Sequence, residues 1–521
     1  MLSRYFKYTY ILLAAVLFTT ASCKKFLVEE DPSNLAPETY YTIPEHADAA
    51  IAAIYGQIRF IGDGAGIFST NYQMFDATTG IMTTETAQNS DLNNLYSLVY
   101  DGNNLHINQM WNGYYKTVAQ ANLALDKIPG IPLMDPAIKK QRLGEAAFLR
   151  AWAYFYLVRF WGDVPLITKP QTATSSDFYP KRTATEDVYK LIVDDLTAAE
   201  AAGFAWVDPS GKVSLAAVKS LLAKVYLTMA GAPLNKGQAY YKLAADKANE
   251  VITYANANPA QIGLLPTYND IHAVANNNKV EHIFEVQYND AAGAGNPLQS
   301  YFLPLHKPVS SIDGVGTSVP TAEFYASYEA GDKRAQNRSG YFYTDYYTNG
   351  YLPTLYNPGR PYVFKHFDII ANGTLGTKGT NRSDLNVPQI RYPDVLLTYA
   401  EAQNEADGTP NTAAWTAMKV IRDRAGLTTP AQGTYSQTTF REAVWRERWH
   451  ELCYEGVLWF DMVRTKKVYN EATNGFDSFT GHVNKSTNQP LQDRHLLFPL
   501  PVSEMKNNPN LRPQNTGYPG I

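Results

Sequence analysis

The sequence contains few cysteines and histidines and no cluster of basic residues. Its 521 residues include two cysteines, Cys23 and Cys453, so the fold must depend on a large core rather than on disulfides. The nine histidines are scattered, and neither the H-E-x-x-H pattern of zinc proteases nor the G-x-S-x-G turn of serine hydrolases occurs. The net charge is −4, which argues against a nucleic-acid partner. These absences predict a protein that is not an enzyme and has no catalytic residues, zinc site or cofactor. No metal ligand is assigned, and a calcium site in the Asn/Asp-rich loops is the alternative that stays open.

No apolar run long enough to cross a membrane follows the first 22 residues. Arg4 and Lys7 precede an apolar run over residues 10–18, which is too short to span a bilayer. Small residues then lead to Cys23. We predict a lipoprotein signal peptide at residues 1–22, lipidation of Cys23, and a lipidated tether at residues 23–42. The alternative is an ordinary signal peptide followed by an incidental cysteine. Loss of the two N-terminal positive charges would change the net charge from −4 to −6.

The stretch from Arg441 to Arg464 has the strongest helical pattern. Its tryptophans and aliphatic residues recur at three- and four-residue steps, which predicts one helix of about six turns. Gly456 would then lie within the helix, where a close crossing by another helix would explain it. Its charged neighbours include one carboxylate row, formed by Glu447, Glu451 and Glu455. We expect this row to form ion pairs that fix the helix register, and a catalytic row is the alternative.

Helical periodicity dominates the rest of the chain and predicts an all-α fold. Further helices are expected at residues 45–59, 106–127, 137–160, 184–202, 214–230, 236–255, 394–407 and 413–425, and the central helix extends over 436–468. Residues 280–288 alternate like a short strand. The helix pairs suggest stacked hairpins, although no clean repeat period is visible. We predict a single domain over residues 43–521, with a loop-rich insertion at about 289–386 that is too aromatic to be disordered.

Several motifs together resemble one family. They are AFLRAWAYF at residues 147–155, GDVPL at 162–166, PQIRYPDVLLTYAEA at 388–402, IRDRAGL at 421–427, ERWHEL at 447–452 and FPLP at 498–501. From Cys23 onward the chain is similar to SusD/RagB outer-membrane lipoproteins of Bacteroidetes. The resemblance implies tetratricopeptide-like helical hairpins that form a scaffold. It also implies a lipid-anchored protein at the cell surface that closes over a SusC-like TonB-dependent transporter. Such proteins bind nutrients, most often glycans, and are not enzymes.

Two carboxylates within these motifs, Glu401 and Glu405, lie four residues apart. A glycosidase needs two carboxylates in a cleft, but these residues lie among apolar neighbours. We therefore expect them to be paired with Arg391, Arg422 or Arg424.

Aromatic residues interleaved with amides in two loop regions predict a ligand-binding face. Flat rings stack on the apolar faces of sugars, and amides and carboxylates hydrogen-bond to the hydroxyl groups. The two regions are residues 72–104 and 301–356. The candidate ligand-binding residues are Tyr72, Asp76, Asn93, Tyr96, Tyr100, Tyr325, Tyr341, Tyr343, Tyr346 and Tyr347. Trp111 is excluded because its helical spacing places it in the core. The alternative is that most of these tyrosines pack the loops onto the body or face the transporter.

The functional expectation is a cell-surface lipoprotein of the outer membrane that captures oligo- or polysaccharide and delivers it to a SusC-like transporter. Two alternatives stay open. One is a lid whose main role is to gate the transporter, and the other is a binder of peptides rather than glycans.

Overall fold

The computed structural model describes residues 40–521 except 173, 307–308, 310–313, 349–351, 353 and 370–381. The predicted signal peptide, Cys23 and most of the predicted tether lie outside the described residues, so these assignments stay predictions. Within the described part of the chain, no helix combines the length and the apolar character that a membrane span requires.

The predicted all-α fold is confirmed. The long helices are α3 (Pro44–Gln57), α5 (Leu105–Lys127), α6 (Pro136–Trp161), α7 (Thr185–Glu200), α8 (Leu215–Ala230), α9 (Gln238–Ala257), α14 (Tyr392–Asp407), α15 (Thr412–Arg424), α16 (Gln437–Leu452) and α17 (Leu458–Thr465). Short helices are α4 (Ser90–Tyr96), α10 (Tyr268–Ile271), α11 (Gln299–Phe302), α12 (Ala322–Ala326) and α18 (Val502–Asn507). Except for the stretch that contains α16 and α17, each predicted helix is present within a few residues of its expected bounds.

Local sequence signals explain where several of these helices begin and end. The side chain of Asn104 accepts hydrogen bonds from the first backbone N–H groups of α5, and Ser436 forms a capping box at the start of α16. Both satisfy N–H groups that have no partner inside the helix. Gly162 ends α6 with φ +71°, and Gly408 ends α14 with φ +73°. Glycine adopts this left-handed conformation without steric cost.

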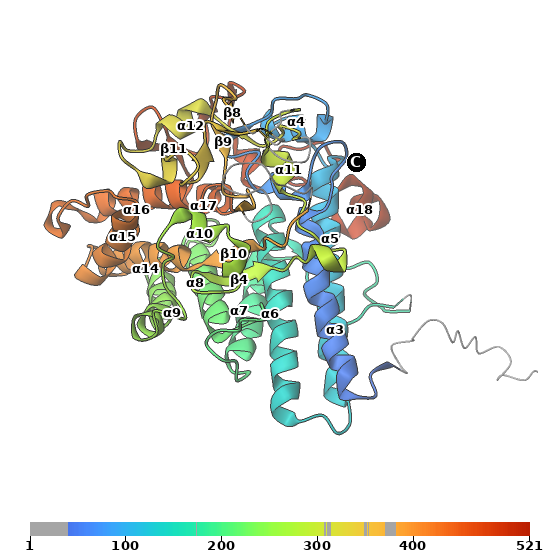
Figure 1. The fold of residues 1–521 in the computed structure, drawn as a ribbon. Coiled ribbons are helices and arrows are strands. Elements are labelled where there is room, and N and C mark those ends of the chain that lie inside the picture. The colour runs from blue at the N-terminus through green and yellow to red at the C-terminus, as the bar shows by residue number, and fades with distance from the viewer. Residues whose placement is uncertain are drawn as a thin grey trace, which may run out of the picture.

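The helices pack as consecutive antiparallel hairpins, α5–α6, α7–α8, α9–α14 and α15–α16, and neighbouring hairpins contact one another. Figure 1 shows these helices side by side, with α3 against α5 and α6. Their apolar faces form one large core, to which α6 alone contributes Phe148, Trp152 and Trp161. Trp111 is 3 % exposed and belongs to this core, as predicted.

Strands are short and occur as two-stranded antiparallel pairs. The pairs are β1 (Met82–Thr83) with β5 (Val319–Pro320), β2 (Val164–Pro165) with β3 (Arg182–Thr183), β4 (His282–Val286) with β10 (Val387–Arg391), β6 (Phe342–Tyr343) with β9 (Tyr362–Val363), β7 (Tyr346–Tyr347) with β8 (Leu355–Tyr356), β11 (Lys467–Asn470) with β12 (Gly475–Ser478), and β13 (Val483–Asn484) with β14 (Gln489–Pro490). The predicted strand at 280–288 is confirmed as β4. Because Val286 pairs with Val387, the insertion leaves and re-enters the scaffold at adjacent points.

The prediction of one continuous central helix is wrong. α16 ends at Leu452 and α17 begins at Leu458, and between them Tyr454 and Gly456 have φ values of +60° and +70°. A Cβ atom on Gly456 would lie 2.9 Å from the ring of Phe75, so the expected close approach exists, but its partner belongs to a short 3₁₀ helix, Asn71–Phe75, and not to a crossing α-helix. Helical spacing continues across the break because both halves pack on the same core, and the periodicity therefore could not reveal it.

Candidate ligand-binding face

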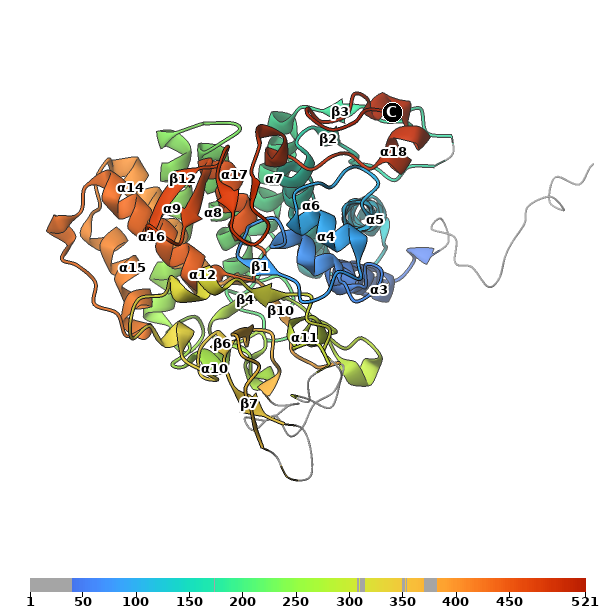
Figure 2. The same ribbon diagram turned by 90° about the horizontal axis from the view of Figure 1, so that it is seen from above.

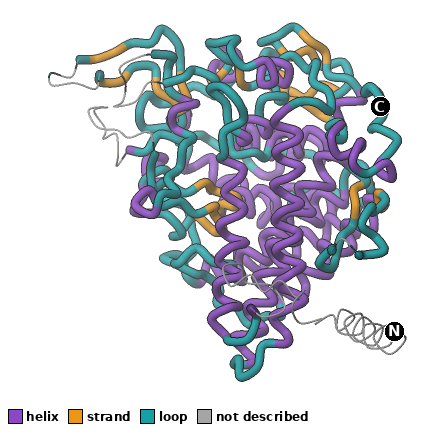
Figure 3. Tube along the Cα trace, turned by 90° about the vertical axis from the view of Figure 1, so that its right-hand side faces the viewer, coloured by secondary structure: helices purple, strands orange, loops and turns teal. Residues whose placement is uncertain are grey.

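Two loop segments, residues 63–104 and 289–369, lie together at one end of the scaffold, and we call their joint surface the loop face. Strand pairing joins them, with Met82 opposite Pro320. Side-chain hydrogen bonds also connect the two segments. The Tyr96 hydroxyl donates to the Thr317 carbonyl at 2.6 Å, and the Gln73 amide donates to Ser318 Oγ at 2.8 Å. Figure 1 shows their elements α4, α11, α12, β8 and β9 above the long helices. In Figure 3 the loops and short strands cover this end of the purple helices.

Glu85 holds the two segments together, although no sequence signal singled it out. Its Oε2 accepts a hydrogen bond from the Leu305 backbone at 3.0 Å, and its Oε1 accepts one from the Tyr362 hydroxyl. The Glu85 backbone N–H donates to the Gly316 carbonyl at 2.8 Å. One residue of the first segment thus binds three positions of the second. Its role depends on partners more than 200 residues away, which the local pattern cannot show.

Four candidate residues of the first segment are buried, so the expectation that they are exposed is wrong. Tyr72, Asp76, Tyr96 and Tyr100 are 2–3 % exposed. The Tyr72 hydroxyl donates to the Tyr454 carbonyl at 3.0 Å, and the Tyr100 ring stacks at 5.0 Å on a ring of the C-terminal FPLP motif. These rings attach the loops to the scaffold, and their faces are not available to a sugar.

Three candidates of the second segment are also buried. Tyr341, Tyr343 and Tyr346 are 0 % exposed. The Tyr341 hydroxyl donates to Glu451 Oε1 at 2.7 Å. The other two belong to a second hydrophobic core, separate from the main one, whose members are Leu303, Val309, Val319, Tyr343, Tyr346, Tyr362, Phe364 and Phe367. The aromatic residues of the insertion therefore include a core of its own, and the expectation that these three tyrosines are exposed is wrong.

The remaining candidates, Asn93, Tyr325 and Tyr347, are half-buried. Asn93 lies on α4, and its side-chain amide has no hydrogen-bond partner among the described residues. The guanidinium carbon of Arg338 lies 5.1 Å from the centre of the Tyr347 ring, and the Tyr325 hydroxyl donates to a backbone carbonyl at 3.3 Å. These three can contact a ligand in the observed conformation, and their binding role stays a prediction.

Exposed apolar side chains on the loop face were missed from the sequence. They are Ile67, Phe68, Val99, Leu352 and Leu355, with exposed fractions between 40 and 78 %. Asn89 holds the first pair in place, because its amide donates to the Ile67 carbonyl at 3.0 Å. Four of the five are aliphatic, a residue type that the aromatic–amide criterion did not select.

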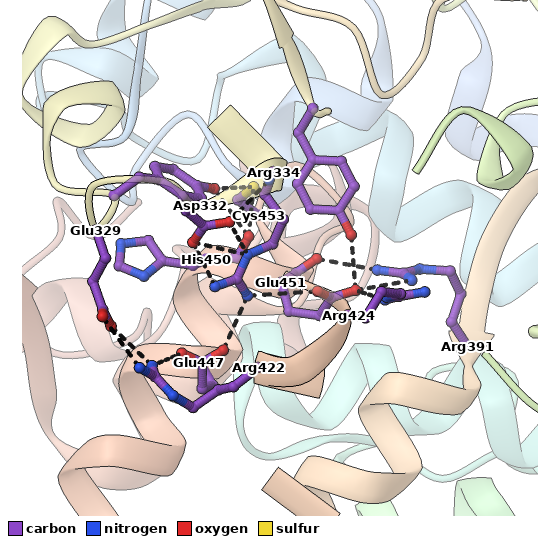
Figure 4. A network of polar contacts seen from close by, with 12 residues as sticks. Glu329, Asp332, Arg334, Arg391, Arg422, Arg424, Glu447, His450, Glu451 and Cys453 are labelled. Atoms are coloured by element: carbon purple, nitrogen blue, oxygen red, sulfur yellow. Dashed lines mark hydrogen bonds and ion pairs between the residues drawn. The ribbon is translucent and has the colours of Figure 1, made fainter. Parts of the chain in front are cut away.

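A buried ionic network supports the loop face from below (Figure 4). Arg334 of the insertion is fully buried and pairs with Asp332 at 2.7 Å and with Glu447 of α16 at 3.1 Å. Arg424 contacts Glu451 at 2.6 Å, and Arg391 contacts Glu455 at 2.6 Å. The expectation that the carboxylate row forms ion pairs is confirmed. These pairs link the insertion to the scaffold in addition to fixing the helix.

The guanidinium groups determine the ionisation of this row. Burial alone would raise the pKa of Glu451, but Arg424, Arg391 and Arg334 outweigh it and hold the pKa below its ordinary value. Burial would also raise the pKa of Glu455, but Arg391 and Lys365 outweigh burial and lower this pKa to about 2. Both groups are therefore ionised and ion-paired, which suits a structural role and not proton transfer.

The expected partners of Glu401 and Glu405 were wrong. Glu401 pairs with Arg464 of α17 and Glu405 with Arg441 of α16. Arg391, Arg422 and Arg424 are instead bound to the carboxylate row and its neighbours, including Glu281 and Glu329. The broken helix explains the difference, because the break turns α17 so that its arginine faces α14.

Asp76 is the exception among the buried acids. Burial raises its pKa to about 7, its Oδ2 accepts a long hydrogen bond of 3.4 Å from Gly456 N–H, and its Oδ1 has no hydrogen-bond partner among the described residues. The positive charge of Lys365 lowers this pKa, and the negative charge of Glu455 raises it. This acid lies at the contact between the first loop segment and the helix break.

Two family models match the chain. One, described as "SusD family", covers residues 323–518, and the other, described as "Starch-binding associating with outer membrane", covers residues 25–227. A crystal structure of a SusD superfamily protein from Parabacteroides distasonis is 34 % identical, with a TM-score of 0.85 over 93 % of this chain and 100 % of that one. The chain belongs to the SusD/RagB family.

Other SusD-family relatives are more distant but span nearly the whole chain. SusD-like protein P2 of Formosa agariphila is 26 % identical over 98 % of this chain and 99 % of its own length. Surface glycan-binding protein A of Bacteroides thetaiotaomicron, solved in complex with laminarihexaose, has a TM-score of 0.71 at 19 % identity over 91 % of this chain and 100 % of that one. This last likeness shows a shared fold. The two family models leave residues 228–322 unmatched, which includes the start of the insertion.

Proposed function

We propose that this SusD-family protein is a lipoprotein of the outer-membrane surface, anchored through Cys23, whose loop face captures oligo- or polysaccharide and delivers it to a SusC-like TonB-dependent transporter. It performs no chemistry on the ligand.

One observation carries the proposal: the described residues of the two loop segments are joined by strand pairing and by Glu85, and they form a shared surface at one end of the helical scaffold. Ligands are commonly bound by loops that a rigid scaffold positions. The half-buried Asn93 and Tyr347 supply an amide and a ring face to that surface. The glycan complex of the thetaiotaomicron relative supports a saccharide as the ligand.

Retardation of the protein in native gels that contain polysaccharides tests the proposal. We expect one glycan class to slow the wild type, and a Asn93→Ala/Tyr347→Ala double variant to migrate freely, because it removes the amide and the ring. Leu133→Ala is the matched control, since this side chain is fully exposed in the turn between α5 and α6. If the double variant is slowed as strongly as the wild type, Asn93 and Tyr347 do not form the site.

A second candidate is a lid with a mainly gating role. The exposed side chains of Ile67, Val99, Leu352 and Leu355 favour it, because aliphatic patches are typical of protein contacts. Under this reading no glycan or peptide on a broad panel binds the isolated protein. The variants Val99→Asp and Leu355→Asp would then weaken co-purification with the transporter.

A further inference from the structure

A groove away from the loop face has the composition of a saccharide site. It lies between α5, residues 165–171 and 178–180, and the C-terminal segment that begins with helix α18, and we call it the side groove. Its volume is about 360 Å³, and its walls include the rings of Trp111, Tyr115, Phe178 and Tyr179. This volume falls within the range of about 300–1,000 Å³ that is usual for small-molecule sites. Figure 2 shows β2, β3 and α18 at one edge of the molecule, and β6, β7 and α10 at the opposite edge.

Two neighbouring rings at the rim of the side groove are exposed to solvent. Phe178 and Tyr179 are 47 % and 54 % exposed, and their rings meet edge to face at 88°, with centroids 5.0 Å apart. Perpendicular rings present two flat walls, so one sugar ring can stack on one wall and contact the other with its edge. On the loop face, by contrast, most of the predicted rings are buried.

The C-terminal segment fixes the exposed ring pair in place. The Asn510 amide donates to the Tyr179 carbonyl at 2.7 Å, and the Asn508 amide donates to the Pro180 carbonyl at 2.8 Å. Within the loop, the Gln171 amide donates to the Asp177 carbonyl at 2.8 Å. A ring pair held by its backbone in this way loses little conformational freedom when a ligand binds.

Glu504 supplies a carboxylate without a counter-charge. It lines the side groove and forms no ion pair with any described residue. Partial burial raises its pKa, and its charge acts on the nearby Tyr115 hydroxyl. A half-buried carboxylate that lacks donors gains most from a ligand that supplies several O–H groups. The exposed amides of Asn112 and Asn507 provide both donors and acceptors beside it.

We propose that the side groove is a second carbohydrate-binding site, which takes one or two rings of a neutral sugar stacked on Phe178 and Tyr179, with hydroxyl groups bound by Glu504. The site extends the proposed glycan function, but it does not depend on the loop face as the place of capture.

Hydrogen–deuterium exchange of the full chain in a non-glycosidic detergent can test the two sites separately. The probes are laminarihexaose and neutral hexasaccharides of other linkages. A tetralysine peptide is the cationic comparison ligand. We expect a neutral saccharide to slow exchange in peptides covering residues 176–181 and 502–511. The Phe178→Ala/Tyr179→Ala variant should abolish this protection, and Leu133→Ala should leave it intact. Glu504→Gln should weaken the apparent affinity about three- to tenfold, because charged acceptors form stronger hydrogen bonds.

The outcomes separate the two proposals. Protection of the loop face alone would overturn the side groove and leave the proposed function standing. Protection of the side groove alone would place capture there and remove the loop face from the proposal. If none of the neutral saccharides protects the side groove, or if only tetralysine does, the side groove is not a carbohydrate site.

Discussion

The loop face and the side groove both contain many aromatic side chains, but they use them differently. In the insertion, Tyr341, Tyr343 and Tyr346 are fully buried and hold the loops in one conformation. At the side groove, Phe178 and Tyr179 are about half exposed, and amides from another segment hold their backbone. The frequency of aromatic residues in a loop therefore does not predict a binding surface, because a long loop needs rings of its own to become ordered.

A substitution at the base of the loop face should destabilise the protein most. Arg334→Met should lower the free energy of unfolding by about 3–5 kcal/mol, because it leaves Asp332 buried without its cation and removes one of the two arginines that pair with Glu447. Chemical denaturation measures the change. Lys419→Met, which removes a partly exposed pair with Asp423, is the matched control and should cost less than about 1 kcal/mol. A small effect of Arg334→Met would mean that the other contacts of the insertion, such as the Tyr341–Glu451 hydrogen bond and the pairing of β4 with β10, anchor it without Arg334.

The next effect is a pH dependence of stability that arises from Asp76, at the contact between the first loop segment and the helix break. Asp76 has a pKa of about 7 in the fold, against an ordinary value of 3.8, so between these values the folded state binds more protons than the unfolded state. Stability should therefore fall as pH rises from about 4 to 7, by up to about 4 kcal/mol from this group.

Asp76→Asn should remove that slope and raise stability above pH 7, since an amide stays neutral and still accepts a hydrogen bond from Gly456 N–H. Denaturation at a series of pH values measures both chains. Parallel curves for wild type and variant would mean that the Asp76 carboxyl titrates normally in the fold.

Two tyrosine substitutions test whether the rings of the two regions differ in their structural role. Tyr343→Ala should cost about 3 kcal/mol because it opens a cavity in the second core, and it should expose the insertion to proteases. Tyr179→Ala removes a side chain that is 54 % exposed and should change stability by less than about 0.5 kcal/mol. Thermal unfolding and limited proteolysis would show both effects. Equal losses would remove the distinction between the two regions.

A further substitution concerns the support of the exposed rings. Asn510→Ala removes one hydrogen bond to the Tyr179 carbonyl, which should cost about 1 kcal/mol. Saccharide protection at the side groove should weaken several-fold, and protection at the loop face should not change. Asn103→Ala is a matched control at an exposed asparagine of the first loop segment. If Asn510→Ala left the side groove unaffected, its rings would be held by the remaining contacts alone.

The sequence predicted the scaffold well, because helical periodicity and capping are local. Helices α5 to α9 are present close to their expected bounds, and so is strand β4. The break at Gly456 was missed because the apolar spacing continues across it. Exposure in the loops was mispredicted because it depends on distant partners: Tyr72, for example, bonds to a carbonyl 382 residues further along the chain.

The side groove was overlooked for a related reason. Its walls come from α5, residues 165–171 and 178–180, and the C-terminal segment, and no single stretch has the composition of a site. The available signal was the adjacent pair Phe178–Tyr179, which lies between polar residues and a proline with no helical spacing. Unlike rings that repeat along a helix, an isolated ring pair in a polar loop has no obvious core to join.

The pairing of Val286 with Val387 has a consequence for how this protein could diversify. The insertion begins and ends on neighbouring strands whose Cα atoms lie about 5 Å apart, so its length can change without moving any scaffold helix. Recombination between relatives could replace the whole insertion at this junction, provided that an arginine equivalent to Arg334 still reaches the carboxylates of α16. A new ligand preference could then arise in a single genetic exchange, while the helical body is inherited unchanged.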